Sequence, residues 1–296
     1  MAHISFQRYL KVKTAIDDRA LDLRVWQTAQ RHLPATRPLR VLELGAGIGT
    51  MLTRMLARGF LPAEVDYTAL DADPANAEAA QAHWQRWAQA HGCACAPDRL
   101  RCPGHEVHLT WEVDDLFTFF ARAQGPWDVV VAHAFLDLID LPAALPRLFA
   151  LAPRGLFYFT LNFDGVTIFE PEIDPAFDAL VLAHYHRTMD ERRAFGRPAG
   201  ESRTGRRLLT LLPSLGARIL AAGSSDWVVY PQEGRYPPGE AEFLHAILDM
   251  IEGALQGRAG LDPQRLADWL AQRRAQVDAG QLVYIAHQLD ITGYFP

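Results

Sequence analysis

The chain has 296 residues, of which 49% are apolar and 22% charged, as in a soluble globular protein with a large buried core. Its formal charge of −6 gives no support for binding nucleic acid or anionic membranes, and no apolar run reaches the ~18 residues that span a bilayer. The first residues lack the charged start and apolar core of a secretion signal, and three cysteines cannot all pair. We therefore expect a cytoplasmic protein with reduced thiols.

The N-terminal segment, residues 6–32, has the apolar spacing of amphipathic helices, with anchors such as Leu10, Leu21 and Trp26. Charged residues crowd its middle. Two interpretations stay open: a solvated helix that covers a sheet, or a helical lid (residues 1–35) that closes over a ligand.

A short apolar strand, Arg40 to Leu44, leads into Gly45, Gly47 and Gly49 and then into a helix. A strand, a tight turn and a helix start let a ligand approach bare backbone N–H groups. The G-x-G-x-G spacing differs from the G-x-G-x-x-G of dinucleotide-binding proteins, and no lysine follows as in a P-loop. What is distinctive is an acid, Glu43, two residues before the first glycine.

The segment Glu43-x-Gly45-x-Gly47-x-Gly49 resembles the first motif of the class I S-adenosylmethionine-dependent methyltransferases. The resemblance implies that the turn, including Ala46, packs against the methionine part of the cofactor, and that Glu43 holds its ammonium group. It also implies that an N-terminal arginine could meet the cofactor's carboxylate, because a guanidinium pairs with a carboxylate through two parallel hydrogen bonds. Arg24 is our candidate for that contact, with Arg19 as the alternative.

A second strand, residues 64–70, ends at Asp71-Ala72-Asp73-Pro74, which matches the family's second motif. The resemblance implies that Asp71, with Ala72 beside it, binds the ribose hydroxyls. Asp73 is placed to cap the following helix, residues 75–89.

A third strand, residues 106–113, ends at Asp114 and Asp115, which resembles the family's adenine-binding position. The resemblance gives the adenine amine to Asp114 and a supporting backbone N–H to Asp115 or Leu116. The alternative is that this acidic pair caps a helix over residues 116–122.

The fourth strand, residues 127–137, ends at the switch point of the sheet, where open α/β proteins bind ligands. His133 and Ala134 are expected beside the cofactor, and His133 and Asp137 are candidates for a catalytic base. A structural role for His133 stays equally open. The segment lacks the Asn/Asp-Pro-Pro-Tyr/Phe pattern of one type of base and amide methyltransferase, and it offers fewer carboxylates than cation-dependent catechol-type enzymes need.

After a fifth strand at residues 155–162, the alternation of strand and helix breaks, and we expect an inserted cap over residues 164–207. Its helix, residues 175–192, carries His184, Tyr185 and His186, which cannot all face one way. We take His184 as the third catalytic candidate, with His186 as an alternative. Aromatic residues in the cap suggest either an aromatic acceptor or simple packing.

The loop at residues 91–105 holds all three cysteines, Cys93, Cys95 and Cys102, together with two histidines. Their spacing is not one of the usual zinc patterns, so we expect free thiols on the surface and no metal.

These features predict an α/β fold: a Rossmann-like, seven-stranded, mostly parallel sheet with helices on both faces. A sixth strand is expected at residues 218–223. The last strand, residues 281–290, is expected to lie antiparallel between the fifth and sixth strands, as in the resembling family. The cofactor-binding core would cover residues 36–163 and continue, after the cap, over residues 208–296.

The expected function is methyl transfer from S-adenosylmethionine to a small molecule, leaving S-adenosylhomocysteine, by a monomer or homodimer. Whether oxygen, nitrogen or carbon is methylated stays open. The alternatives are a cofactor-binding protein without transferase activity, and an NAD-dependent oxidoreductase on a similar fold.

Overall fold

A computed structural model describes residues 4–194 and 196–296 of the chain. In that part of the chain, ten strands form one sheet, in the order β10-β12-β7-β6-β1-β2-β5-β4-β3, with β11 paired to β12. The strands of this sheet are β1 (Leu39–Leu44), β2 (Glu64–Asp71), β3 (Ala94–Ala96), β4 (Arg99–Cys102), β5 (His105–Val113), β6 (Val129–His133), β7 (Leu156–Glu170), β10 (Arg218–Ser224), β11 (Trp227–Val229) and β12 (Val283–Tyr294).

The seven expected strands form the core of this sheet. Strands β5, β2, β1, β6 and β7 are parallel, and β12 lies antiparallel between β7 and β10. The prediction of a mostly parallel Rossmann-like sheet with an antiparallel last strand is therefore confirmed.

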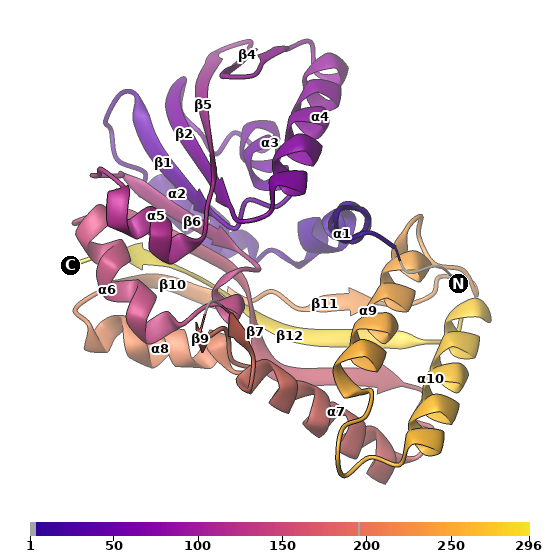
Figure 1. Cartoon of the computed structure of the whole chain (residues 1–296). Helices are drawn as coiled ribbons and strands as arrows, with labels where there is room; N and C mark the ends of the chain where they lie inside the picture. Colours follow the sequence, from indigo (N-terminus) through magenta and orange to yellow (C-terminus); the bar gives the residue numbers. More distant parts are fainter. Residues whose placement is uncertain (1–3, 195) are drawn as a thin grey trace.

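Helices cover both faces of the sheet (Figure 1). Successive side chains of β1 point to opposite faces, so that Leu39 and Val41 join one buried cluster and Leu42 and Leu44 the other. On the first face lie α1 (Phe6–Ala20), α2 (Leu23–Arg31), α3 (Thr50–Ala57) and α4 (Pro74–Ala90). On the second lie α5 (Leu116–Arg122), α6 (Leu141–Leu151) and α8 (Thr204–Ser214).

Strand β7 continues well past the expected end at residue 162, up to Glu170. Asp164 was expected to open the cap, but Asp164 and Gly165 lie within the continuing strand, in which Leu161 and Gly165 have positive φ of 53° and 75°. The extension of β7 pairs with β12, which pairs with β11 in turn.

Three further helices surround this extension (Figure 1). They are α7 (Pro175–Asp190), α9 (Glu240–Leu255) and α10 (Pro263–Asp278). After α7 a short hairpin, β8 (Arg193–Ala194) and β9 (Arg197–Pro198), returns toward the carboxyl ends of the core strands. None of the helices in the described ranges is both long and apolar enough to cross a membrane.

Candidate active site

A cavity of about 1020 Å³ lies where the carboxyl ends of β1, β2, β5 and β6 meet. This is the edge at which open α/β sheets bind ligands, because the loops leaving neighbouring parallel strands converge there. Helix α1 contributes Phe6, Leu10 and Lys13 to the wall of the cavity, and the β8–β9 hairpin contributes Arg197 and Pro198. The cavity is thus walled by the core, the N-terminal helix and the segment expected to be a cap.

The glycine turn forms one wall of this cavity, with Gly45 and Gly47 in its lining. All three glycines have positive φ (63°, 55° and 73°), a conformation that L side chains rarely adopt. A Cβ on Gly45 would lie 2.1 Å from the ring of Phe135, and one on Gly49 would lie 2.4 Å from the indole nitrogen of Trp84. The turn therefore requires glycine both for its backbone and for the closeness of its neighbours.

Glu43 lies at the inner end of the cavity and is 1% exposed. Its Oε2 accepts a hydrogen bond of 2.7 Å from the hydroxyl of Tyr67. Burial raises the pKa of this carboxyl to about 8, an effect that the Tyr67 hydrogen bond and the nearby Arg54 only partly offset. The protein alone therefore holds Glu43 largely protonated near neutral pH, and an adjacent cation would shift it toward its ionised form.

Asp71 joins the end of β2 to the glycine turn. Its Oδ2 accepts the Gly47 N–H at 2.8 Å, and its Oδ1 accepts the Asp73 N–H at 2.9 Å and the Asn76 amide at 3.0 Å. The carboxylate also lines the cavity, where its remaining lone pairs can accept hydroxyl groups. Asp73 caps α4, as expected for the residue before Pro74.

Asp114, Asp115 and Leu116 line the cavity at the end of β5. The Asp115 side chain accepts the Thr118 N–H and caps α5, so the helix-cap prediction for this acidic pair holds for Asp115. Asp114 accepts both the Asp115 N–H and two hydrogen bonds from Arg122. Its carboxylate is thus held in place by a cation on the outer side of the site.

His133 lines the cavity at the end of β6, and both of its ring nitrogens have partners. Nδ1 lies 2.7 Å from the Thr160 hydroxyl, and Nε2 lies 3.2 Å from Asp17 Oδ2 and 3.4 Å from Arg54 Nη1. Burial lowers the pKa of this histidine to about 4, although the hydrogen bond to Asp17 opposes the shift. Because the ring is neutral and both nitrogens already have partners, His133 is better suited to positioning neighbouring groups than to removing a proton from a substrate.

The N-terminal cation that lines the cavity is not the one we expected from the sequence. Arg24 is exposed, donates to the carbonyl of Ala222 on β10, and is not among the cavity-lining residues. Lys13 of α1 lines the cavity instead, is 6% exposed, and has its Nζ 2.6 Å from Asp17. The exposed Arg19 pairs with Glu240 on α9.

Sequence reasoning missed Lys13 and Asp17 because no motif marks them. The available signal was their i, i+4 spacing on a segment for which a lid over a ligand was one of the two open interpretations. The carboxylate of Asp17 accepts from Lys13 and from the Trp227 indole and contacts His133, so it joins α1 to β6 and β11. Burial opposes ionisation of Asp17, but Lys13, His133 and Arg54 together hold its pKa below the ordinary value.

The other two catalytic candidates occupy different places. Asp137 lies on a 3-10 turn, η1 (Leu136–Leu138), between residues that line the cavity. His184 is buried in α7 against Gly260 and is not part of the cavity lining. His133 therefore lines the cavity, whereas Asp137, on the segment that follows β6, and His184 are not among the lining residues.

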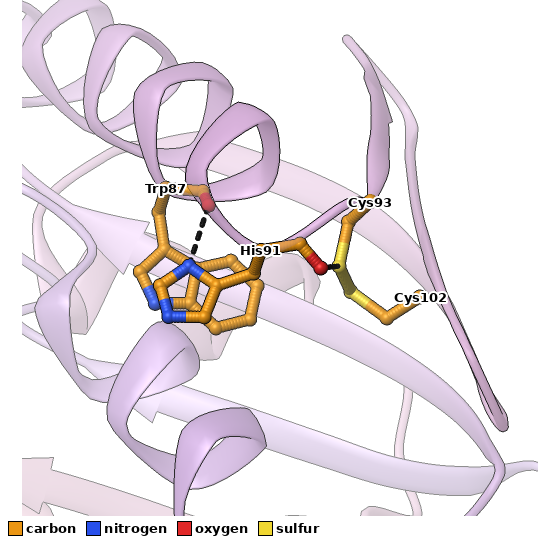
Figure 2. Close-up of a disulfide and its surroundings, with 4 residues drawn as sticks. All are labelled: Trp87, His91, Cys93 and Cys102. Carbon is orange, nitrogen blue, oxygen red and sulfur yellow. Dashed lines mark hydrogen bonds between the residues drawn. A yellow bond between two sulfur atoms is a disulfide. The ribbon is translucent and has the colours of Figure 1, made fainter.

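The cysteine segment differs from our expectation of free thiols in a loop. Residues 94–102 form the β3–β4 hairpin, and Cys93 and Cys102 are joined by a disulfide bond (Figure 2). His91 stacks on Trp87 at the end of α4, where the hairpin begins. Cys95 remains a free thiol, and within the described ranges no His, Cys, Asp and Glu side chains group closely enough to hold a metal ion.

Fold and site together define a Rossmann-like α/β protein with its ligand cavity at the switch point of the sheet. A sequence model of the methyltransferase-domain family matches residues 17–194, which is more than half of the chain. The chain belongs to this family, the class I methyltransferases, whose methyl donor is S-adenosylmethionine and whose product is S-adenosylhomocysteine.

Comparison with solved structures finds similar chains at low sequence identity. Mycolic acid cyclopropane synthase CmaA1, in complex with SAH and CTAB, is 13% identical with a TM-score of 0.45 over 92% of this chain and 83% of that one. A candidate type II methyltransferase from Anaeromyxobacter dehalogenans is 17% identical with a TM-score of 0.49 over 92% and 95%. YjhP from E. coli is 14% identical with a TM-score of 0.43 over 97% and 98%. A search of curated protein sequences finds no match.

Proposed function

We propose that this protein transfers a methyl group from S-adenosylmethionine to a small-molecule acceptor. The observation that supports this most directly is that one cavity collects Glu43, Gly45, Asp71, Asp114 and His133 from the ends of four neighbouring strands. The methyltransferase motifs assign Glu43 and Gly45 to the amino-acid part of the cofactor, Asp71 to the ribose and Asp114 to the adenine. His133 lies at the strand end where methyl transfer is expected.

The charges in the cavity suit an amino-acid zwitterion next to the glycine turn. Glu43 offers a carboxyl group to an ammonium group, and Lys13 offers an ammonium group to a carboxylate. In this proposal Lys13 takes the part that we first gave to Arg24. Asp71 and Ala72 would contact the ribose, and Asp114, Asp115 and Leu116 the adenine.

The cofactor supplies an electrophilic methyl group on a positively charged sulfur, which leaves as a neutral thioether without acid catalysis by the protein. The residues of the chain hold donor and acceptor in line and exclude water, and such positioning supplies several kcal/mol of the rate enhancement. His133, bonded to Thr160 and Asp17, orients this part of the cavity. Helix α1 and the β8–β9 hairpin cover it.

A pair of matched carboxylate substitutions on β2 tests the proposal. Asp71→Asn replaces one acceptor oxygen with an amide NH₂ group, so a ribose hydroxyl that donates to this oxygen would lose its acceptor. The affinity for S-adenosylhomocysteine should therefore fall about 5- to 100-fold. Asp66→Asn changes the same strand on the opposite face, where the side chain is exposed, and should leave the affinity unchanged. Isothermal titration calorimetry measures both.

Absence of S-adenosylhomocysteine binding by the wild-type protein would refute the proposed function. Equal affinities for wild type and Asp71→Asn would remove Asp71 from the ribose site but leave the cofactor assignment in place.

A further inference from the structure

Two neutral amide side chains, Asn76 and Gln7, link helix α1 to the carboxylate that we assign to the ribose. Asn76 lies in the first turn of α4, is 2% exposed and lines the cavity. Its Nδ2 donates to Asp71 Oδ1 at 3.0 Å, and its Oδ1 accepts from Gln7 Nε2 at 3.0 Å. The same Gln7 nitrogen donates to Asp73 Oδ2 at 3.1 Å. These four residues thus form one hydrogen-bond network between α1 and the end of β2.

The carboxylates at the two ends of the network fix the orientation of both amides. A carboxylate accepts hydrogen bonds but has no donor of its own. Asn76 must therefore turn its NH₂ group toward Asp71, which leaves its carbonyl oxygen for Gln7. Gln7 must likewise turn its NH₂ group toward Asp73. Rotation of either amide by half a turn would bring two acceptor oxygens together, so each amide has one favourable orientation.

The donors around Asp71 determine which of its oxygens can serve a ligand. Oδ1 accepts from the Asp73 N–H and from the Asn76 amide, whereas Oδ2 accepts only from the Gly47 N–H. Because the two oxygens of a carboxylate offer about four acceptor positions, Oδ1 is filled and Oδ2 keeps one free. The network therefore holds the carboxylate against rotation and leaves Oδ2 for a ribose hydroxyl.

No cation competes with a ligand for these two carboxylates. Within residues 4–194 and 196–296, Asp71 and Asp73 accept hydrogen bonds only from backbone N–H groups and from the amides of Asn76 and Gln7. A lysine or arginine bonded to Asp71 would form a stronger, charge-assisted hydrogen bond and would occupy the free position. Neutral amides orient the carboxylate and still leave its negative charge for the hydroxyl groups of a sugar.

Gln7 also fixes the beginning of α1 beside the cavity. Its neighbour Phe6 lines the cavity and is 52% exposed. The later part of α1 is held by the buried Asp17, which bonds to two strands. At the exposed beginning, Arg8 pairs with Glu242 of α9 at the surface, and only the hydrogen bonds of Gln7 join the described side chains of this turn to the cavity wall.

We propose that Asn76 and Gln7 are positioning residues for the ribose of the cofactor. Asn76 orients the Asp71 carboxylate, and Gln7 fastens the start of α1 over the bound ribose. This inference rests on the proposed function and adds two residues to its site. It requires that Asn76 act on the ribose hydroxyls in particular, and that Gln7 control how long the cofactor stays bound.

The test compares S-adenosylhomocysteine with its 2′,3′-dideoxy analogue, which lacks both ribose hydroxyls, on the full-length protein. Asn76→Ala should weaken the binding of S-adenosylhomocysteine about 5- to 30-fold in calorimetry, because Asp71 loses a donor that orients it. The same substitution should change the affinity for the dideoxy analogue by less than about twofold, since this analogue donates no hydroxyl to Asp71. A general structural defect would weaken both ligands alike.

Gln7→Met provides a second variant with little risk to folding, because Gln7 is only half-buried and Met keeps the length of the side chain. S-adenosylhomocysteine should dissociate from this variant about 3- to 10-fold faster in stopped-flow fluorescence, because α1 loses its hydrogen bonds to α4. Gln27→Met makes the same substitution at an exposed position of α2 and should change neither the affinity nor the dissociation rate.

The inference is overturned if the wild type binds both ligands equally, or if Asn76→Ala weakens both equally or leaves the binding of S-adenosylhomocysteine intact. It is also overturned if Gln7→Met leaves the dissociation rate unchanged. A wild-type protein that binds no S-adenosylhomocysteine would instead count against the proposed function.

Discussion

Two titratable residues of the cavity are driven toward their neutral forms by the same physical cause. Burial raises the pKa of Glu43 to about 8 and lowers that of His133 to about 4. For each residue, the free-energy cost of removing the charged form from water exceeds the stabilisation that nearby hydrogen bonds and charges provide. The difference between the two residues is that His133 already has partners at both nitrogens, whereas the proposed function gives Glu43 an ammonium group as an additional partner.

This difference predicts that cofactor affinity depends on pH. In the protein without ligand the pKa of Glu43 is raised to about 8, and an adjacent ammonium group would lower it. Cofactor binding should therefore release a proton. The affinity for S-adenosylhomocysteine should therefore rise with pH, by up to about tenfold per unit between about pH 6 and 8. Calorimetry in phosphate and Tris, whose ionisation heats differ, measures both the affinity and the released proton.

Glu43→Gln should bind more weakly and without this pH dependence. An affinity that is the same across the range, with no buffer-dependent heat, would show that Glu43 does not meet the ammonium group.

At the scale of single elements, helix α1 is fixed over the cavity by charge as well as by apolar packing. Val12 and Ile16 are buried in the core cluster, while Lys13 and Asp17 form a buried pair on the cavity side. The bonds from Asp17 to His133 and Trp227 cross from α1 to two strands that are far away in the sequence. The helix is thus an integral wall of the site.

The β3–β4 hairpin is held by a disulfide bond as well as by its pairing with β5. The Cys93–Cys102 disulfide closes a short loop with a sequence separation of 9, which predicts a contribution of about 2–3 kcal/mol to the free energy of unfolding. The double substitution of Cys93 and Cys102 to Ser should lose that amount in chemical denaturation.

Because the hairpin pairs with β5 at the outer edge of the sheet, the double variant should keep its affinity for S-adenosylhomocysteine. Cys95→Ser is the control, since Cys95 is a free thiol, and it should change neither property. Stability that is unaffected by dithiothreitol would contradict the prediction.

At the scale of the molecule, the long strands β7 and β12 unite the Rossmann-like core with the extension that carries α7, α9 and α10 (Figure 1). Asp290 lies on β12, within this pair of long strands, and is fully buried. Its Oδ1 accepts the Leu161 N–H at 2.8 Å and its Oδ2 accepts the Asp22 N–H at 2.9 Å, which joins β7 and the start of α2 to β12.

Burial raises the pKa of Asp290 to about 7, which gives a definite sign to the pH dependence of stability. The folded state binds this proton more tightly than the unfolded state, so the stabilisation is complete below the ordinary pKa of about 4 and is lost as the pH rises toward about 7. The unfolding free energy should decrease by up to about 1.4 kcal/mol per pH unit over that range from this group.

Asp290→Asn should be less stable at about pH 5, because an amide retains one acceptor oxygen and loses the other, and its stability should fall less steeply with pH. Urea denaturation at several pH values measures both slopes. A wild-type stability that rises from about pH 5 to about pH 7 would contradict the assignment.

The sequence alone determined the local features of this protein: the strand, glycine turn and helix around Gly45, the carboxylates that end β2 and β5, and the antiparallel last strand implied by the family resemblance. These features depend on short spacings along the chain and on backbone conformations that few residue types adopt, so they can be predicted from the local sequence. His133 was found in the same way, from its place at the end of a strand.

Tertiary structure alone decided which distant side chains complete the site. That Lys13 rather than Arg24 faces the cavity, that Cys93 pairs with Cys102, and that β7 continues through Asp164-Gly165 depend on neighbours brought together by folding. Asp17 and His133 are separated by 116 positions along the chain, and no local pattern encodes their contact. Burial and the choice of partner, which set the charge of Glu43, Asp17 and Asp290, exist only once the sheet and its helices are assembled.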